Sequence, residues 1–144
     1  RYTKYDTNEQ GVLYCQSIES FEYDAQNHVT LHSLLSAPNT KNEGGWSYEY
    51  RFEGENKVYE ASLNYKDGAW EKNYYTEWTY EKDHVKTLSR YSLSEGQMVL
   101  GGTDEYQYDK EYNLLGILGY WNNEGEVTLQ TKSVYYYSNK YKNY

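Results

Sequence analysis

Residues 70–93 read WEKNYYTEWTYEKDHVKTLSRYSL, and this stretch decides the fold of the chain. Large or β-branched side chains in its first half share one parity: Trp70, Tyr74, Thr76, Trp78 and Tyr80. The other parity is mostly polar: Glu71, Asn73, Glu77, Thr79 and Glu81. Alternation of period two is typical of a strand with one buried face, and aromatic residues suit such a pleated surface. We predict a strand over 70–81 whose aromatic parity faces a core.

The second half of the stretch returns as a more aliphatic strand. The polar residues 81–84 between the two strands are short enough for a hairpin, which joins antiparallel neighbours. We expect Tyr80 to pair with Val85 across this turn. An unbroken register then places Trp78 opposite Thr87 and Tyr74 opposite Tyr91, both favourable cross-strand pairs.

The same unit recurs along the chain with nearly constant spacing. Each copy ends in a short aromatic motif, and the motifs close on tyrosines: Tyr23, Tyr50, Tyr80, Tyr108 and Tyr137. Twelve residues before four of these tyrosines stands a glycine: Gly11, Gly68, Gly96 and Gly125. Pro38 takes that place in the remaining copy, and both residue types favour turns. Such self-similarity predicts a repeat architecture built from one hairpin unit.

The pattern as a whole predicts an all-β protein. About ten strands are expected, near residues 1–6, 11–24, 28–36, 46–53, 57–65, 70–81, 85–93, 97–109, 114–121 and 126–138. Short turns between them predict an antiparallel meander. Because open sheets of this size usually curl, split or close, we expect a curled sheet or a barrel-like or sandwich-like form. The longest connection, residues 37–45, is too short to separate two domains, so we predict a single β-repeat domain over 1–144.

Composition argues against several classes of partner. The formal net charge is −8, whereas nucleic-acid binding favours a basic patch, so we expect no nucleic-acid partner. No stretch is long and apolar enough for a transmembrane helix, so we expect a protein that does not span a membrane. The single Cys15 cannot form an internal disulfide. Because the chain starts at Arg1, we expect an exported protein, secreted or held in the cell envelope, whose leader is not visible.

Two of the closing tyrosines precede an aspartate, in FEYDAQNHV at residues 21–29 and YQYDKEYNL at residues 106–114. On these segments the chain resembles bacterial YD-repeat (Rhs-like) proteins, and it is similar to uncharacterised secreted Bacteroidales proteins with tyrosine-rich hairpins. Arg51, Glu81 and Ser138 replace the aspartate in the other copies. Asn27 and Tyr112 stand where the family usually has a glycine. The resemblance implies an extracellular or cell-envelope β-structure and carries over no catalytic residues.

Metal ligands are sparse in this sequence. His28 and His32 are close together, but a full ligand set is missing, and we interpret them as solvated or hydrogen-bonded side chains. Residues 6–11 resemble the first half of a calcium loop, yet Ser17 stands where the bidentate acid is needed. We interpret that segment as a plain turn. We therefore expect no metal and no cofactor.

Catalytic motifs are equally sparse. No family signature surrounds Cys15 or any serine. Glu49, Glu71 and Glu77 would have to pair across strands to act as in a glycosidase, and their polar parity favours a solvated surface. We therefore predict that the protein is not an enzyme, with a hydrolase as a distant alternative.

The aromatic residues give the one functional lead. Trp46, Trp70, Trp78 and Trp121, with neighbouring tyrosines, are candidate contacts for sugar rings, because such rings combine an apolar body with a polar tip. The competing interpretation is that they only form the core face. Trp46 and Trp121 are the favoured pair, since each borders a glycine-containing turn or loop.

Two non-catalytic functions follow from this lead. The first is an extracellular or cell-envelope binding module whose partner is a glycan or another protein. The alternative is a structural or protein-interaction repeat. A glycan array separates these two hypotheses, and a broad hydrolase screen tests the third.

Overall fold

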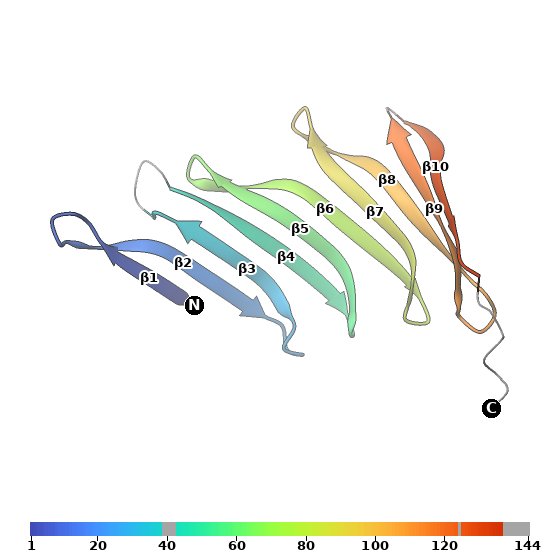
Figure 1. Ribbon diagram of the computed structural model, residues 1–144, viewed down its shortest axis with the longest axis horizontal. Helices are drawn as coiled ribbons and strands as arrows, with labels where there is room; N and C mark the ends of the chain where they lie inside the picture. The colour runs from blue at the N-terminus through green and yellow to red at the C-terminus, as the bar shows by residue number, and fades with distance from the viewer. Residues whose placement is uncertain (39–42, 124, 137–144) are drawn as a thin grey trace.

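The computed structural model describes residues 1–38, 43–123 and 125–136, and Figure 1 shows that they form a single twisted layer. The ten strands are β1 (Tyr2–Thr7), β2 (Leu13–Tyr23), β3 (Val29–Ser36), β4 (Gly44–Glu53), β5 (Asn56–Lys66), β6 (Ala69–Glu81), β7 (His84–Ser94), β8 (Gln97–Tyr108), β9 (Leu114–Asn123) and β10 (Glu126–Val134). Strand order in the sheet follows the sequence, and each neighbouring pair is antiparallel. The predicted all-β meander is confirmed. Among the described residues there is no helix, and no pairing joins β1 to β10, so the sheet stays open.

The turns explain the glycine spacing seen in the sequence. Gly11, Gly68, Gly96 and Gly125 have φ values of 76°, 85°, 78° and 93°. The clearest case is the β5–β6 turn, where Asp67 and Gly68 both have positive φ, as a two-residue type I′ turn requires. The repeated glycines therefore mark turns that favour a residue without Cβ. The last closing tyrosine, Tyr137, and Ser138 lie outside the described residues.

A β-bulge breaks the unbroken register that the sequence predicts. Tyr80 pairs with Val85 as expected, but Lys86 is an extra residue, so Trp78 lies opposite Leu88 and Tyr74 opposite Ser92. The extra residues at the same place in the equivalent hairpins are Thr30, Val58 and Leu115. A bulge sets two residues of one strand against one residue of its partner. The predicted pairs of Trp78 and Tyr74 are therefore wrong.

A second set of bulges changes which face a side chain occupies. Leu63 pairs with Lys72 and Ser62 pairs with Tyr74, so Asn73 is an extra residue within β6. Trp70 therefore points to the face opposite to that of Tyr74, because a one-residue step in register exchanges the faces. The predicted shared parity is wrong for Trp70. The equivalent extra residues elsewhere are Gln16, Gly101 and Gln130.

The buried centre lies on the face that the sequence assigns to solvent. Tyr59, Ala61 and Leu63 are 6%, 0% and 8% exposed, and Tyr75 packs against them. Tyr59 lies directly opposite Glu77, so Glu77 shares this face, which we call the core face. The prediction is wrong because aromatic and charged side chains share the face: Lys72 lies over the rings of Tyr59 and Tyr75.

The opposite face carries Tyr74, Trp78 and Trp121, and we call it the hollow face. Its large rings are half-buried or exposed, because no second layer covers the sheet in the described part of the chain, whereas the small Ser62 opposite Tyr74 is buried. The aromatic parity of β6 therefore does not form the main core. In a single layer, a side chain is covered only by neighbours on its own face.

The two Tyr-Asp turns adopt the same conformation. The Asp24 carboxylate accepts hydrogen bonds from the backbone N–H groups of Gln26 and His28, both at 2.9 Å. Asp109 accepts the same pair of bonds from Glu111 and Asn113, at 2.8 and 2.9 Å. Hydrogen bonding by the side chain and then the backbone of Asn113 lowers the pKa of Asp109. The third residue after each aspartate has positive φ, 71° at Asn27 and 61° at Tyr112, so the turn forms without the usual glycine.

Candidate functional site

A shallow hollow of about 560 Å³ lies over β6–β10. Its lining residues include Tyr74, Thr76, Arg90, Gly102, Asp104, Gly119, Trp121 and Thr131. Direct pairing places Thr76, Arg90, Gly102 and Trp121 in one cross-strand row of the hollow face. Asp104, Gly119 and Thr131 belong to the next row. The hollow is thus built by side chains from five successive strands.

Two buried glycines form its floor. A Cβ on Gly102 would lie 2.8 Å from the carbonyl oxygen of Tyr120, and a Cβ on Gly119 would collide with the Thr131 hydroxyl. Glycine inside a strand often marks a close approach of another group. Here it also leaves two places in the sheet without a side chain. The floor of the hollow is therefore formed by backbone.

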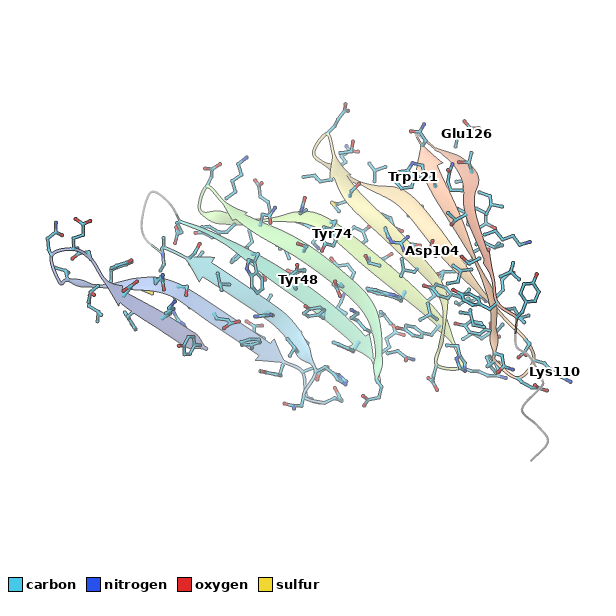
Figure 2. The ribbon with its side chains drawn as sticks, in the orientation of Figure 1. Tyr48, Tyr74, Asp104, Lys110, Trp121 and Glu126 are labelled. Atoms are coloured by element: carbon cyan, nitrogen blue, oxygen red, sulfur yellow. The ribbon has the colours of Figure 1, made fainter. Side chains whose placement is uncertain are left out.

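Aromatic rings stand at the sides of the hollow. Figure 2 shows Tyr74 on β6 and Trp121 on β9, with Asp104 on β8. Trp121 is 58% exposed and Tyr74 is 38% exposed. The Trp121 ring reaches within 3.8 Å of the Cβ position of its cross-strand partner Gly102, as aromatic rings often cover strand glycines. Much of the ring nevertheless remains open to solvent.

The polar groups of the hollow are paired with each other. Arg90 Nη2 donates to Asp104 Oδ2 at 2.6 Å, and Arg90 is the more exposed partner. Burial raises the pKa of Tyr74, and the nearby Tyr48 raises it further by a smaller amount, so the Tyr74 hydroxyl stays protonated at neutral pH. Paired charges and a neutral phenol offer donors and acceptors without a net charge. Chemically, the hollow suits a neutral ligand that carries hydroxyl groups and an apolar face.

The structure separates the four tryptophans that the sequence selects. Only Trp121 lines the hollow. Trp46 is half-buried, with its ring edge-on to His32 at 4.7 Å, and Trp78 lies beneath Lys57 at 4.7 Å. Trp70 is on the core face, where its ring contacts Tyr65 at a centroid distance of 5.1 Å. The four do not form one platform.

Sequence reasoning missed most of the hollow. Tyr74 was assigned to the core, and neither Arg90 nor Asp104 was selected. One signal was available: Gly101 and Gly102 are adjacent inside a predicted strand, where glycine indicates a bulge or a close approach. The structure has both, a bulge at Gly101 and a close approach at Gly102.

The other candidate side chains have local partners. His28 Nδ1 lies 2.9 Å from Asp24 and its Nε2 lies 3.4 Å from Glu55, while His32 Nε2 lies 2.8 Å from Glu19. Within residues 1–38, 43–123 and 125–136 there is no group of three or more His, Cys, Asp or Glu side chains arranged to hold a metal ion.

The three glutamates considered for a glycosidase-like pair do not come together. Glu49 and Glu77 belong to the core face, and Glu49 lies 3.6 Å from Lys72. Glu71 pairs with Asn64, which lies opposite Trp46, so it belongs to the hollow face.

Comparisons with known proteins support the fold. No family model matches the chain, and no curated protein matches it. A solved structure of a protein of unknown function from Bacteroides fragilis is similar, with a TM-score of 0.58 and 12% identity over 83% of this chain and 92% of that chain. This likeness shows the fold alone and agrees with the resemblance to uncharacterised Bacteroidales proteins. In the described part of the chain, no helix is long and apolar enough to cross a membrane.

Proposed function

We propose that this chain is a non-catalytic binding module that holds a neutral glycan in the hollow between Tyr74 and Trp121. The observation that carries the proposal is the exposure of Trp121, which is 58% open to solvent beside a floor of buried glycines. An exposed aromatic ring costs solvation free energy that a stacked apolar face of a sugar would recover. The glycine floor leaves room for a flat ring to approach.

The polar groups support the same ligand class. Sugar hydroxyls both donate and accept, and the Arg90–Asp104 pair offers both functions on adjacent strands. Because this pair is already neutralised, a charged ligand would have to break or outcompete the ion pair. A neutral ligand only adds to it.

We further propose an extracellular or cell-envelope location, as in the bacterial YD-repeat proteins that the chain resembles. The two Tyr-Asp turns support this relationship, because both keep the aspartate-centred hydrogen bonds despite the loss of the glycine. In that setting, glycans of surface polymers are accessible ligands.

The test is a neutral-glycan panel followed by calorimetry on the positive members. Trp121→Ala should weaken binding by about tenfold or more, which corresponds to about 1.4 kcal/mol. Trp70→Ala is the matched control, since it removes the same residue type from the opposite face at 38% exposure. Its affinity should equal that of the unmodified chain. Affinity should also change little with salt, because no charge is neutralised on binding.

Two results would contradict the proposal. One is a panel in which no neutral glycan binds the unmodified chain. The other is equal loss of affinity in Trp121→Ala and Trp70→Ala variants that both keep their thermal midpoint. Tyr74→Phe then sharpens a positive result, because it retains the ring and removes only the hydroxyl group.

A further inference from the structure

The two edges of the sheet are complementary halves of a pairing that recurs inside it. In the β2–β3, β4–β5, β6–β7 and β8–β9 hairpins, an aromatic strand pairs with the return strand that follows it. The bulge residue Gln130 lies in β10 where the bulge residue Gly101 lies in β8, so β10 and β8 take the same position in the repeated unit. β1 pairs with β2 around the bulge residue Gln16, just as β9 pairs with β10 around Gln130. β1 therefore takes the position of β9 in the unit. β10 thus takes the position of an aromatic strand, although its own residues are not aromatic, and β1 takes the position of a return strand. Within the described residues, neither has a strand on its outer side.

The edge strand β10 is exposed and poorly protected. All nine residues of β10 are exposed, and Val127, Leu129 and Val134 are 62%, 54% and 48% open to solvent. Natural edge strands are usually shielded by proline, by several charges or by a covering segment. β10 has no proline, and its two charged residues, Glu126 and Lys132, lie six positions apart. In the described part of the chain, no strand pairs with the outer side of β1 or β10.

The direction of the backbone groups can be traced on β10. The N–H of Tyr135 donates to the carbonyl of Leu115 at 2.8 Å, so it points toward β9. Backbone groups alternate along a strand, so Ser133 also faces β9, whereas Lys132 and Val134 face outward. Ile117 opposite Ser133 then faces β10, and Leu118 faces β8.

The same trace applies to β1 through the register of its bulge. The register shifts between Lys4 and Tyr5 of β1 and between Gly119 and Tyr120 of β9. Lys4 and Tyr5 thus correspond to Gly119 and Tyr120, and Thr3 corresponds to Leu118. The backbone N–H of Leu118 faces the neighbouring strand β8. On β1 that side is empty in the described structure. Thr3 and Val134 thus present unpaired backbone groups at opposite edges.

We propose that β10 of one copy pairs with β1 of a second copy of this chain, head to tail, in the register of the β8–β9 pair. This register sets Val134 opposite Thr3 and Lys132 opposite Tyr5 of the second copy, with Ser133 opposite Lys4. Because β1 runs in the same direction as β9, a shift along the sheet keeps the new pair antiparallel. Like charges directly opposite each other would destabilise a strand pair, and none of these three pairs brings like charges together.

The proposed interface is heterologous, because it joins two different surfaces, β10 of one copy and β1 of the next. Each added copy leaves one free edge of each kind, so the assembly grows by repeated addition and does not stop at a two-fold dimer. β1 has six residues and β9 has ten, so the new contact repeats only the part of the β8–β9 pairing that lies away from its turn. The area added by one strand pair is below that of a standard interface, so association is expected only at high protein concentration.

The test is sedimentation equilibrium of the 144-residue chain from about 10 µM to about 1 mM, the range in which weak contacts become populated. The mean mass of the unmodified chain should rise through and beyond the dimer. Val134→Pro removes the outward N–H of β10 without removing a bond to β9, and Thr3→Pro does the same on β1. Each variant alone should remain monomeric, whereas an equimolar mixture should form dimers and nothing larger, because one intact edge of each kind remains.

Matched controls keep the backbone donor. Val134→Thr and Thr3→Val retain the N–H group and a β-branched side chain, so both should associate like the unmodified chain. Circular dichroism melts check that every variant folds, and Lys132→Pro replaces Val134→Pro if the latter does not. A monomeric unmodified chain at every concentration overturns the proposal. Dimers of Thr3→Pro alone also overturn it, because they require pairing of β10 with β10.

Discussion

The centre of the sheet and its C-terminal end are built from the same hairpin unit, yet they bury it differently. Over β4–β6, Tyr59 is covered by Arg51, by Lys72 and by the ring of Tyr75. On the hollow face over β8–β10, Gly102 and Gly119 supply no side chain to cover their neighbours, and Trp121 stays 58% exposed. Burial in a single layer therefore depends on whether the neighbours on one face are large enough to cover each other.

One cross-strand row shows this change from end to end. From Tyr59, this row on the core face runs to the last strand as follows: Tyr59, Glu77, Ser89, Thr103, Tyr120 and Leu129. Tyr59 is 6% exposed and Leu129 is 54% exposed. Ser89 and Thr103 in the middle of the row are small, and Leu129 lies on the last described strand, so Tyr120 is its one neighbour within the row. The same row thus contains part of the core and part of an open edge.

The largest expected effect contrasts the two ends of that row. Tyr59→Ala should lower the free energy of unfolding by about 3–5 kcal/mol, because it removes a buried ring at the centre of the core cluster. Leu129→Ala should change it by about 0.5 kcal/mol, since the side chain is largely exposed. Urea melts of both variants measure the difference. Equal losses would show that the two ends of the sheet are equally buried, which would break the comparison.

A smaller effect is expected from filling the glycine floor. Gly102→Ala should cost about 1–3 kcal/mol, because the new Cβ lies too close to the Tyr120 carbonyl oxygen. Gly101→Ala is the adjacent control, with its nearest contact at an ordinary 3.7 Å. Thermal melts should separate the two variants. If Gly102→Ala is as stable as Gly101→Ala, the floor is not tightly packed.

A still smaller effect concerns a hydrogen bond that recurs in the hairpin units, from a tyrosine hydroxyl to a backbone carbonyl of an earlier strand. The Tyr80 hydroxyl donates to the Lys57 carbonyl at 2.8 Å, and the Tyr108 hydroxyl donates to the Val85 carbonyl at 2.9 Å. Tyr80→Phe and Tyr108→Phe should each cost about 0.5–1.5 kcal/mol in urea melts. By register, Phe52 holds the equivalent place in β4, so the prediction of Tyr50 as the closing residue of that copy is wrong. Phe52→Tyr should gain stability by forming the missing bond. A clear loss in Phe52→Tyr would mean that this bond is not part of the repeat unit.

The smallest effect compares the two Tyr-Asp turns. The hydrogen bond to Asp24 raises the pKa of His28 above its usual value, and the second turn has Asn113 at the equivalent place. A raised folded-state pKa adds stability that is fully present below the unfolded value of 6.5 and is lost as pH rises through the folded value. The melting-temperature difference between the unmodified chain and His28→Asn should therefore shrink from pH 6 toward pH 8.5. A difference that grows over this range would reverse the assigned sign.

The sequence predicted the strands well and their faces poorly. Alternation, turn glycines and the spacing of the closing tyrosines located all ten strands, because these signals are local. Bulges such as Asn73 and Lys86 are not visible in an alternating pattern, since each depends on how the neighbouring strand pairs. Trp70 was therefore assigned to the wrong face, and the buried centre was expected on the face of Trp78.

The candidate site shows the same division. Trp121 was selected because it lies beside a glycine-containing turn, and it proved to be exposed. Tyr74, Arg90 and Asp104 come from three other strands, and only the register brings them to one hollow. No spacing along the chain predicts that these three residues lie close together.

By itself, the sequence determined that this protein is an antiparallel meander of repeated hairpins, because alternation and turn chemistry act over a few residues. Only the tertiary structure decided that the sheet stays open, that Tyr59 and not Trp78 lies at its buried centre, and that Gly102 and Trp121 border a hollow. The reason is that each bulge shifts the pairing by one residue, and the effect on a face appears only when all ten strands are aligned.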